Sequence, residues 1–252
     1  MKLMYSAKND TLVTRHQMEQ LITPPAMGAF HHPYPFAEYI DTVEHALGLE
    51  GIQVANEEYA ITNDAMRFFG MMEIAPKEGQ LITSDEWKLT LGLRGSHDQR
   101  IPRGLVLGTS VMVCSNLCFH GNVANFSTKQ TTNIASRLPE LVRESVKRIP
   151  MLAEAQEQAF DDLRNMELSP EDGDNLLVDI YRRGGFSSPQ LTRAIDEWHE
   201  PSHGEHAAQG WSAWRLFNAG TEAIKPTGAT TNMVTIEQRS GIIESVILDA
   251  AA

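Results

Sequence analysis

The chain has 252 residues, of which 42% are hydrophobic and 21% charged, and it carries a formal net charge of −12. This balance is typical of a globular protein with a core and excludes a disordered or fibrous chain. No apolar run reaches the roughly 18–20 residues that cross a bilayer, and residues 1–10 turn polar too soon for a signal peptide, so we expect a protein of the bacterial cytoplasm with no membrane partner.

The first half of the chain predicts two helices followed by strands. Helices are expected over residues 14–22 and 36–47, where apolar positions recur on one helical face. From residue 52 onward apolar positions alternate, as they do in half-buried strands. The predicted strands cover residues 52–61, 66–74, 87–93 and 106–119. They would form an antiparallel meandering sheet of about four or five strands.

The second half returns to helical periodicity. An apolar stripe starts at Ile134, and Pro150 kinks or restarts that helix. Ser169 and Ser188 are each followed by a proline, which predicts two further helix starts. Two more helices are expected over residues 211–225 and 235–248. The fold class is therefore α+β, with a sheet-containing part (residues 1–130) and a helical part (131–252) packed as one unit.

Positive charge is concentrated in the segment Trp87–Arg148. This segment carries a net charge of +6, so the rest of the chain carries −18. A split of this size is typical of a face that meets an anion, most often nucleic acid. Alternatively, the cations are scattered over different faces and pair with acids elsewhere.

Two stretches carry a family resemblance. The first reads Leu-Gly-Leu-Arg-Gly-Ser-His-Asp (residues 91–98), Gly-Thr-Ser-Val-Met-Val-Cys-Ser-Asn (108–116) and Phe-His-Gly (119–121). The second reads Trp-Arg-Leu-Phe-Asn-Ala-Gly-Thr-Glu (214–222), followed by Lys225. Together they resemble the phage- and plasmid-related domain of unknown function catalogued under number 932, which implies a mobile-element origin and no particular activity. Gly95 and Gln130 depart from that pattern, which commonly has Asn and His there.

The loop after the strand over residues 87–93 is the predicted binding site. Arginines can hold phosphates with two hydrogen bonds, and hydroxyl and backbone N–H groups can add donors. The residues predicted to contact nucleic acid are Arg94, Ser96, His97, Arg100, Arg103 and Lys129. Alternatively, residues 96–98 form a turn whose side chains cap the local backbone.

Catalytic and metal sites are less well supported. Three consecutive residues seldom converge, so Ser96, His97 and Asp98 do not predict a hydrolase triad. An enzyme remains an alternative if His97, Asp98 and His120 meet in a cleft. Cys114 and Cys118 cannot complete a tetrahedral metal site by themselves and are expected to be buried. No phosphate-loop or dinucleotide fingerprint is present, so we expect neither a metal nor a cofactor.

The leading hypothesis is a phage- or plasmid-encoded, non-enzymatic protein that handles DNA, preferably single-stranded, as a homo-oligomer. Strand annealing in recombination would be a natural role for such a protein. A second hypothesis is an interaction protein that inhibits a host defence complex through an acidic surface. Its best segment is Glu154–Asp179, which Arg164 interrupts.

Overall fold

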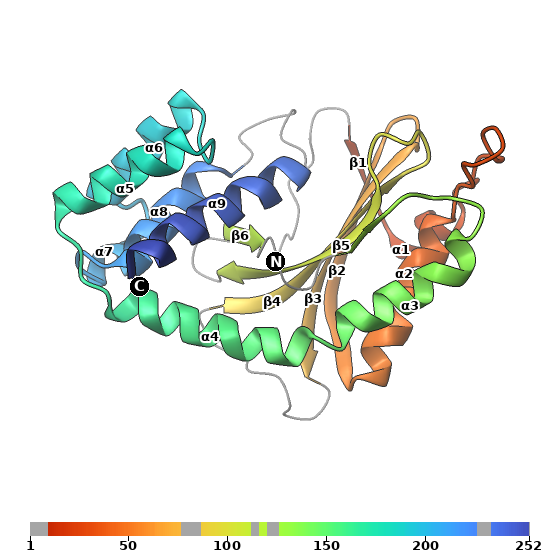
Figure 1. The fold of residues 1–252 in the computed structure, drawn as a ribbon, viewed down its shortest axis with the longest axis horizontal. Helices are drawn as coiled ribbons and strands as arrows, with labels where there is room; N and C mark the ends of the chain where they lie inside the picture. Colours follow the sequence, from red (N-terminus) through yellow and green to blue (C-terminus); the bar gives the residue numbers. More distant parts are fainter. Residues whose placement is uncertain (1–9, 77–86, 112–115, 120–125, 226–232, 252) are drawn as a thin grey trace.

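A computed structural model describes residues 10–76, 87–111, 116–119, 126–225 and 233–251. Its sheet crosses the middle of the molecule, and helices gather at both ends (Figure 1). The strands are β1 (Asp10–Val13), β2 (Ile52–Thr62), β3 (Arg67–Pro76), β4 (Trp87–Ser96), β5 (Arg103–Val111), β6 (Asn116–Phe119) and β7 (Phe126–Thr128). The helices are α1 (Arg15–Glu19), α2 (Phe36–Leu49), α3 (Ile134–Val146), α4 (Ile149–Asn165), α5 (Pro170–Arg182), α6 (Ser188–His199), α7 (Gly204–Ala208), α8 (Ala213–Ala223) and α9 (Met233–Ala251).

The described strands form one antiparallel sheet in the order β1-β2-β3-β4-β5-β6. Strand β7 pairs with the first residues of β5, and β6 pairs with its last residues. Because β4 occupies the other side of β5, both short strands extend the same edge. A register shift lies in β2 between Val54 and Asn56.

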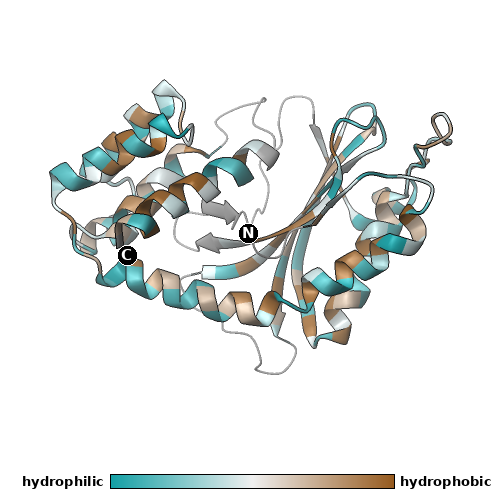
Figure 2. Ribbon diagram, viewed as in Figure 1, coloured by the Kyte–Doolittle hydropathy of each residue, from teal (hydrophilic) through white to brown (hydrophobic). Residues whose placement is uncertain are grey.

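Helices cover both faces of the central strands. Seven consecutive residues of β3 are buried, and successive side chains of a strand point to opposite faces. On one face, Phe36 and Tyr39 of α2 pack against Phe68, with ring centroids 5.1 and 6.4 Å apart. On the other face, Glu237 of α9 pairs with a side chain of β4. Hydrophobic positions run along the strands and through α8 and α9 (Figure 2).

Helix ends follow the local sequence signals. Thr14 caps α1 in a capping box with Gln17. The Ser169 hydroxyl accepts a hydrogen bond from the N–H of Asp172 at the start of α5. Helix α4 starts at Ile149 with Pro150 in its first turn, which confirms the predicted restart.

The α+β class is confirmed, with the sheet in the first half and helices in the second. The sheet is larger than predicted, with seven strands among the described residues. The single strand expected over residues 106–119 is in fact two antiparallel strands, β5 and β6. Strands β1 and β7 have four and three residues, too few for alternation to reveal them.

One hydrophobic core includes residues of both halves of the chain. Phe160 of α4 connects them, because its ring contacts Trp87 of the sheet and both Trp214 and Phe217 of α8. Among the described helices, none is both long and apolar enough to cross a membrane.

Candidate nucleic-acid interface

Two arginines on neighbouring strands are accommodated by glycines on the strand opposite. Arg94 of β4 pairs with Gly104 of β5, and one position further Arg103 lies against Gly95. A Cβ atom on Gly95 would lie 2.8 Å from Arg103 Nη1, and one on Gly104 would lie 3.1 Å from Arg94 Nε. Because the two pairs are adjacent, their side chains lie on opposite faces of the sheet. Arg94 pairs with Glu237 and is largely buried.

Arg103 is fully buried, at 0% exposure. Its Nη2 donates to the Tyr34 carbonyl (2.6 Å) and to Oε1 of Gln130 (3.0 Å). The guanidinium also lies 5.0 Å from the ring centroids of Phe36 and Tyr39. Burial lowers the pKa of Arg103 to about 10, so it remains charged at neutral pH. This cation is enclosed in the interior and does not reach the surface.

Gln130 connects three segments of the chain in the same region. Its Oε1 accepts from the N–H of Tyr34 (2.7 Å) as well as from Arg103, and its Nε2 donates to the carbonyl of Ser96. The amide provides a donor and an acceptor at once. The Gln found where the family pattern has His therefore has a structural role in this chain.

Ser96 and His97 are also buried. The Ser96 hydroxyl closes the β4–β5 turn through the backbone N–H and carbonyl of Ile101. The His97 ring stacks on Phe36 with centroids 4.0 Å apart. Its Nδ1 has no hydrogen-bond partner among the described residues. Burial, with smaller effects of Arg103 and His31, lowers the pKa of His97 to about 4, so the ring is neutral at pH 7.

Asp98 contacts other backbone and side-chain groups than His97 does. Its carboxylate accepts hydrogen bonds from Arg67 Nε (2.9 Å) and from the N–H of Arg100 (3.1 Å). Burial by itself would raise the pKa of Asp98. The hydrogen bonds from Ser96, Arg100 and Arg67 outweigh the effect of burial, so the pKa is lowered. His97 and Asp98 thus do not converge in one cleft, and His120 lies outside the described residues, as do Cys114 and the side chain of Cys118. Within the described part of the chain no group of three metal-ligating side chains is present.

Only two of the six predicted contact residues are exposed. Arg100 lies in the β4–β5 turn with 74% of its side chain accessible, and Lys129 follows β7. Four further cations of the same segment are exposed on α3 or directly after it. These six residues, here called the basic strip, are Arg100, Lys129, Arg137, Arg143, Lys147 and Arg148.

The basic strip follows connected parts of the fold. Because Thr128 of β7 is paired with the first residue of β5, Lys129 lies at the sheet end that carries the turn with Arg100. Helix α3 starts just beyond it and leads to α4 (Figure 1). Arg137 and Arg143 lie on α3, and Lys147 and Arg148 form the two-residue connection from α3 to α4.

Few carboxylates neutralise the basic strip. Glu144 lies 3.6 Å from Lys147 Nζ and 4.0 Å from Arg143 Nη2. Asp98 lies 3.8 Å from Arg100 Nε. The described residues form no ion pair with Lys129, Arg137 or Arg148. The strip therefore retains positive charge that an external anion can neutralise.

The four cations on and directly after α3 contribute to the net charge of +6 in the segment Trp87–Arg148, but they were not among the residues predicted to contact nucleic acid. The signal that could have identified them is the apolar stripe of Ile134, Leu138 and Val142, all of which are buried. Cations off that stripe are directed to solvent. By contrast, β-strand periodicity could not reveal that Arg94 and Arg103 are covered by helices on two different faces.

The second family-like stretch is part of the core. Every residue of α8 is buried. Arg215 donates to the carbonyls of Trp198 (3.0 and 2.6 Å) and His199 (3.2 Å), and so caps the C-terminal end of α6. Glu222 is paired with Lys225 and also with Arg193 of α6 at 2.9 Å.

The polar segment before α8, residues 200–210, is partly helical and partly buried. It contains the short helix α7, and His206 on that helix is buried. Burial lowers the pKa of His206. Local composition could not show that α8 passes next to this segment.

Comparison with known proteins finds no matching family model and no similar curated protein or solved structure. The family resemblance of the two sequence stretches therefore stays a prediction.

Proposed function

We propose that the protein binds the sugar–phosphate backbone of nucleic acid through the basic strip. The supporting observation is that six cations are exposed along one stretch of an otherwise acidic protein. Three of them, Lys129, Arg137 and Arg148, form no ion pair with any described residue, so binding an anion there breaks no internal pair. Binding is non-enzymatic in this proposal and needs no cofactor.

Counterion release makes such binding depend on salt. If all six cations contact phosphates, the slope of log K against log salt is about −5 for duplex DNA and about −4 for a single strand. Backbone contacts do not read base sequence, so affinity should vary little between sequences of equal length. A role in strand annealing or recombination would use this property.

Charge reversal of two arginines, on and directly after α3, tests whether the basic strip binds nucleic acid. We expect Arg137→Glu/Arg148→Glu to lower the affinity for a labelled oligonucleotide by about tenfold at low salt and to reduce the salt slope by about 2. Fluorescence anisotropy over a series of salt concentrations measures both quantities. Light scattering of the same samples reports whether the protein is an oligomer.

The matched control is Arg182→Glu/Arg183→Glu. These two arginines are also exposed, and they lie on and directly after α5, where their nearest carboxylates are Asp179 and Asp249. This control makes the same change in net charge away from the basic strip, and its affinity should change less than about threefold. Absence of binding at low salt, or an equal loss in both variants, would exclude the proposal.

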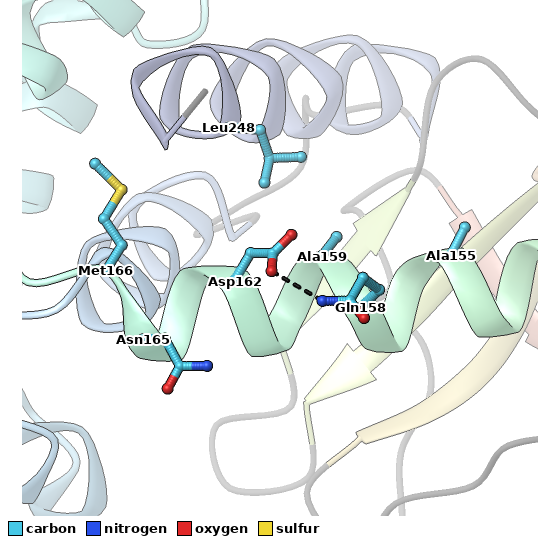
Figure 3. A pocket seen from close by; sticks show the side chains of 7 residues that line it. All are labelled: Ala155, Gln158, Ala159, Asp162, Asn165, Met166 and Leu248. Carbon is cyan, nitrogen blue, oxygen red and sulfur yellow. Dashed lines mark hydrogen bonds between the residues drawn. The ribbon is translucent and has the colours of Figure 1, made fainter.

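A second candidate function is binding of a basic protein partner through the helical part. Arg164 interrupts the acidic segment in sequence, but its guanidinium lies 5.0 Å from the Trp214 ring, and its Nη1 donates to Asp161 (2.7 Å). The exposed charges of this segment are thus all carboxylates: Glu154, Asp161, Asp162, Glu167, Glu171 and Asp172. A pocket of about 630 Å³ lies between α4 and Leu248 of α9, where Asp162 accepts a hydrogen bond from Gln158 (Figure 3).

Affinity capture from bacterial lysate distinguishes this second function. A partner that is retained by the unmodified protein and lost with Asp161→Lys/Asp162→Lys would support it. An unchanged set of captured proteins would speak against it.

A further inference from the structure

A groove of about 400 Å³ runs between α2 and α3, next to the basic strip. Its apolar walls come from Ala46 and Leu49 of α2 and from Pro139 of α3. Leu49 is 63% exposed, so its apolar side chain is accessible to a ligand in the groove. Arg143, a member of the basic strip, lines the same groove. The groove thus places apolar surface directly beside a phosphate-binding cation.

The polar groups of the groove can contact a planar heterocycle. His45 lies one helical turn before Leu49, so the two share a side of α2, and an imidazole ring can stack on a base. The Thr42 hydroxyl donates to the Glu38 carbonyl (2.7 Å), and the Ser136 hydroxyl donates to the Asn133 carbonyl (3.0 Å). The Ser136 hydroxyl hydrogen is used within α3, so its oxygen can only accept towards the groove, whereas the Thr42 hydroxyl also interacts with the Tyr34 side chain.

Glu140 adds a charged acceptor to this lining. A carboxylate repels phosphate but accepts hydrogen bonds from the exocyclic amino group of a base. The groove therefore favours the base of a nucleotide, and Arg143 favours its phosphate. A nucleotide in the groove would therefore have its base near Glu140 and its phosphate near Arg143.

We infer that the α2–α3 groove holds an unstacked base of single-stranded nucleic acid whose phosphates contact Arg143 and the adjacent Lys147. In a duplex the bases are paired and stacked, so they cannot enter a lateral groove, whereas a single strand can turn a base outward. This inference rests on the proposed function and specifies its substrate class as single-stranded. The duplex would bind through backbone contacts alone.

The first test compares two oligonucleotides on the unmodified protein. One is a deoxycytidine oligonucleotide, whose bases carry an exocyclic amino group, and the other has the same length and charge but consists of abasic sites. We expect the deoxycytidine oligonucleotide to bind about tenfold more tightly at equal salt, because only it has bases to place in the groove. Both should show a similar salt slope, since the phosphates are the same.

A groove-filling variant then tests whether the groove is the site of this preference for bases. Ser136→Leu places an apolar branched side chain in the groove from an exposed helical position. It should remove the preference for the deoxycytidine over the abasic oligonucleotide and leave abasic binding unchanged within about twofold. The control is Ser245→Leu on α9, where the serine is likewise exposed and its hydroxyl donates to the carbonyl three residues earlier (3.1 Å). Thermal unfolding verifies that both variants are folded.

The outcomes separate the two proposals. Equal affinity for both oligonucleotides would overturn the groove inference and leave backbone binding intact. A preference that persists in Ser136→Leu, or that Ser245→Leu also removes, would overturn the groove as its location. Failure to bind either oligonucleotide or duplex at low salt would overturn the proposed function and, with it, this inference.

Discussion

Individual side chains near the β4–β5 turn have structural tasks that their type alone does not reveal. His97 is 2% exposed and stacked on Phe36. Arg103 is completely buried without a carboxylate partner among the described residues, and its charge is stabilised by carbonyl, amide and aromatic contacts. Both were predicted to contact nucleic acid. In the folded protein neither is at the surface, so the proposed interface uses other cations.

Burial of His97 predicts a loss of stability in acid. The pKa of His97 is lowered to about 4 in the folded protein, against about 6.5 in an unfolded chain. Between these pH values the unfolded chain binds a proton that the folded protein does not, so the free energy of unfolding falls as pH falls. The full shift corresponds to at most about 3 kcal/mol. Urea denaturation at pH 7 and pH 4.5 measures the fall.

A substitution tests whether His97 causes this fall in the free energy of unfolding. His97→Phe should flatten the pH dependence, because it keeps the stacked ring and removes the titrating nitrogen. His206, also buried, would retain part of the fall in this variant. An equal pH dependence in His97→Phe and in the unmodified protein would contradict this explanation.

At the scale of elements, the β4–β5 pair depends on a close match between a long side chain and a glycine. A Cβ atom at position 95 would lie 2.8 Å from Nη1 and 3.0 Å from Cζ of Arg103. We expect Gly95→Ala to lower the free energy of unfolding by about 1–3 kcal/mol. In an Arg103→Met background the cost should fall to less than half, because a flexible thioether replaces the branched guanidinium. Chemical denaturation of the four proteins gives this coupling.

A glycine without close neighbours provides the comparison. A Cβ atom on Gly48 of α2 would meet nothing within 4 Å, so Gly48→Ala should raise stability by about 0.5–1 kcal/mol through helix propensity. If Gly95→Ala cost as much in the Arg103→Met background as it does beside the native Arg103, the close contact would not be its cause.

Helices α6 and α8 show the same dependence on tertiary partners. Arg215 of α8 supplies the hydrogen bonds that the last carbonyls of α6 lack within their own helix. Glu222 of the same helix pairs with Arg193 of α6. The family-like stretch of α8 is thus explained by packing between helices, and no catalytic role is needed for its charged residues.

At the scale of the whole molecule, charge changes sign between consecutive helices. Helix α3 and the two residues after it carry four exposed cations (Arg137, Arg143, Lys147 and Arg148) against two exposed carboxylates (Glu140 and Glu144), whereas the exposed charges from Glu154 to Asp172 are all carboxylates. The acidic helices would repel a nucleic acid from the helical part, so binding should be confined to the α3 end of the molecule. Phe160 joins the two regions through the shared core.

The sequence by itself determined the elements whose signals are local. The apolar spacing of α2 and α3, the cap at Ser169, Pro150 at the start of α4 and the alternation of β4 were all sufficient to predict the α+β class. It also determined the charge imbalance, because composition does not depend on folding.

Only the tertiary structure decided which cations remain available to a ligand. Arg94 and Arg103 lie close in sequence to exposed residues, yet helices far away in sequence cover them on two opposite faces of the sheet. The α2–α3 groove likewise requires two helices that are separated in sequence by strands β2 to β7. Burial is a property of long-range packing, whereas periodicity reports only the local side on which a residue lies.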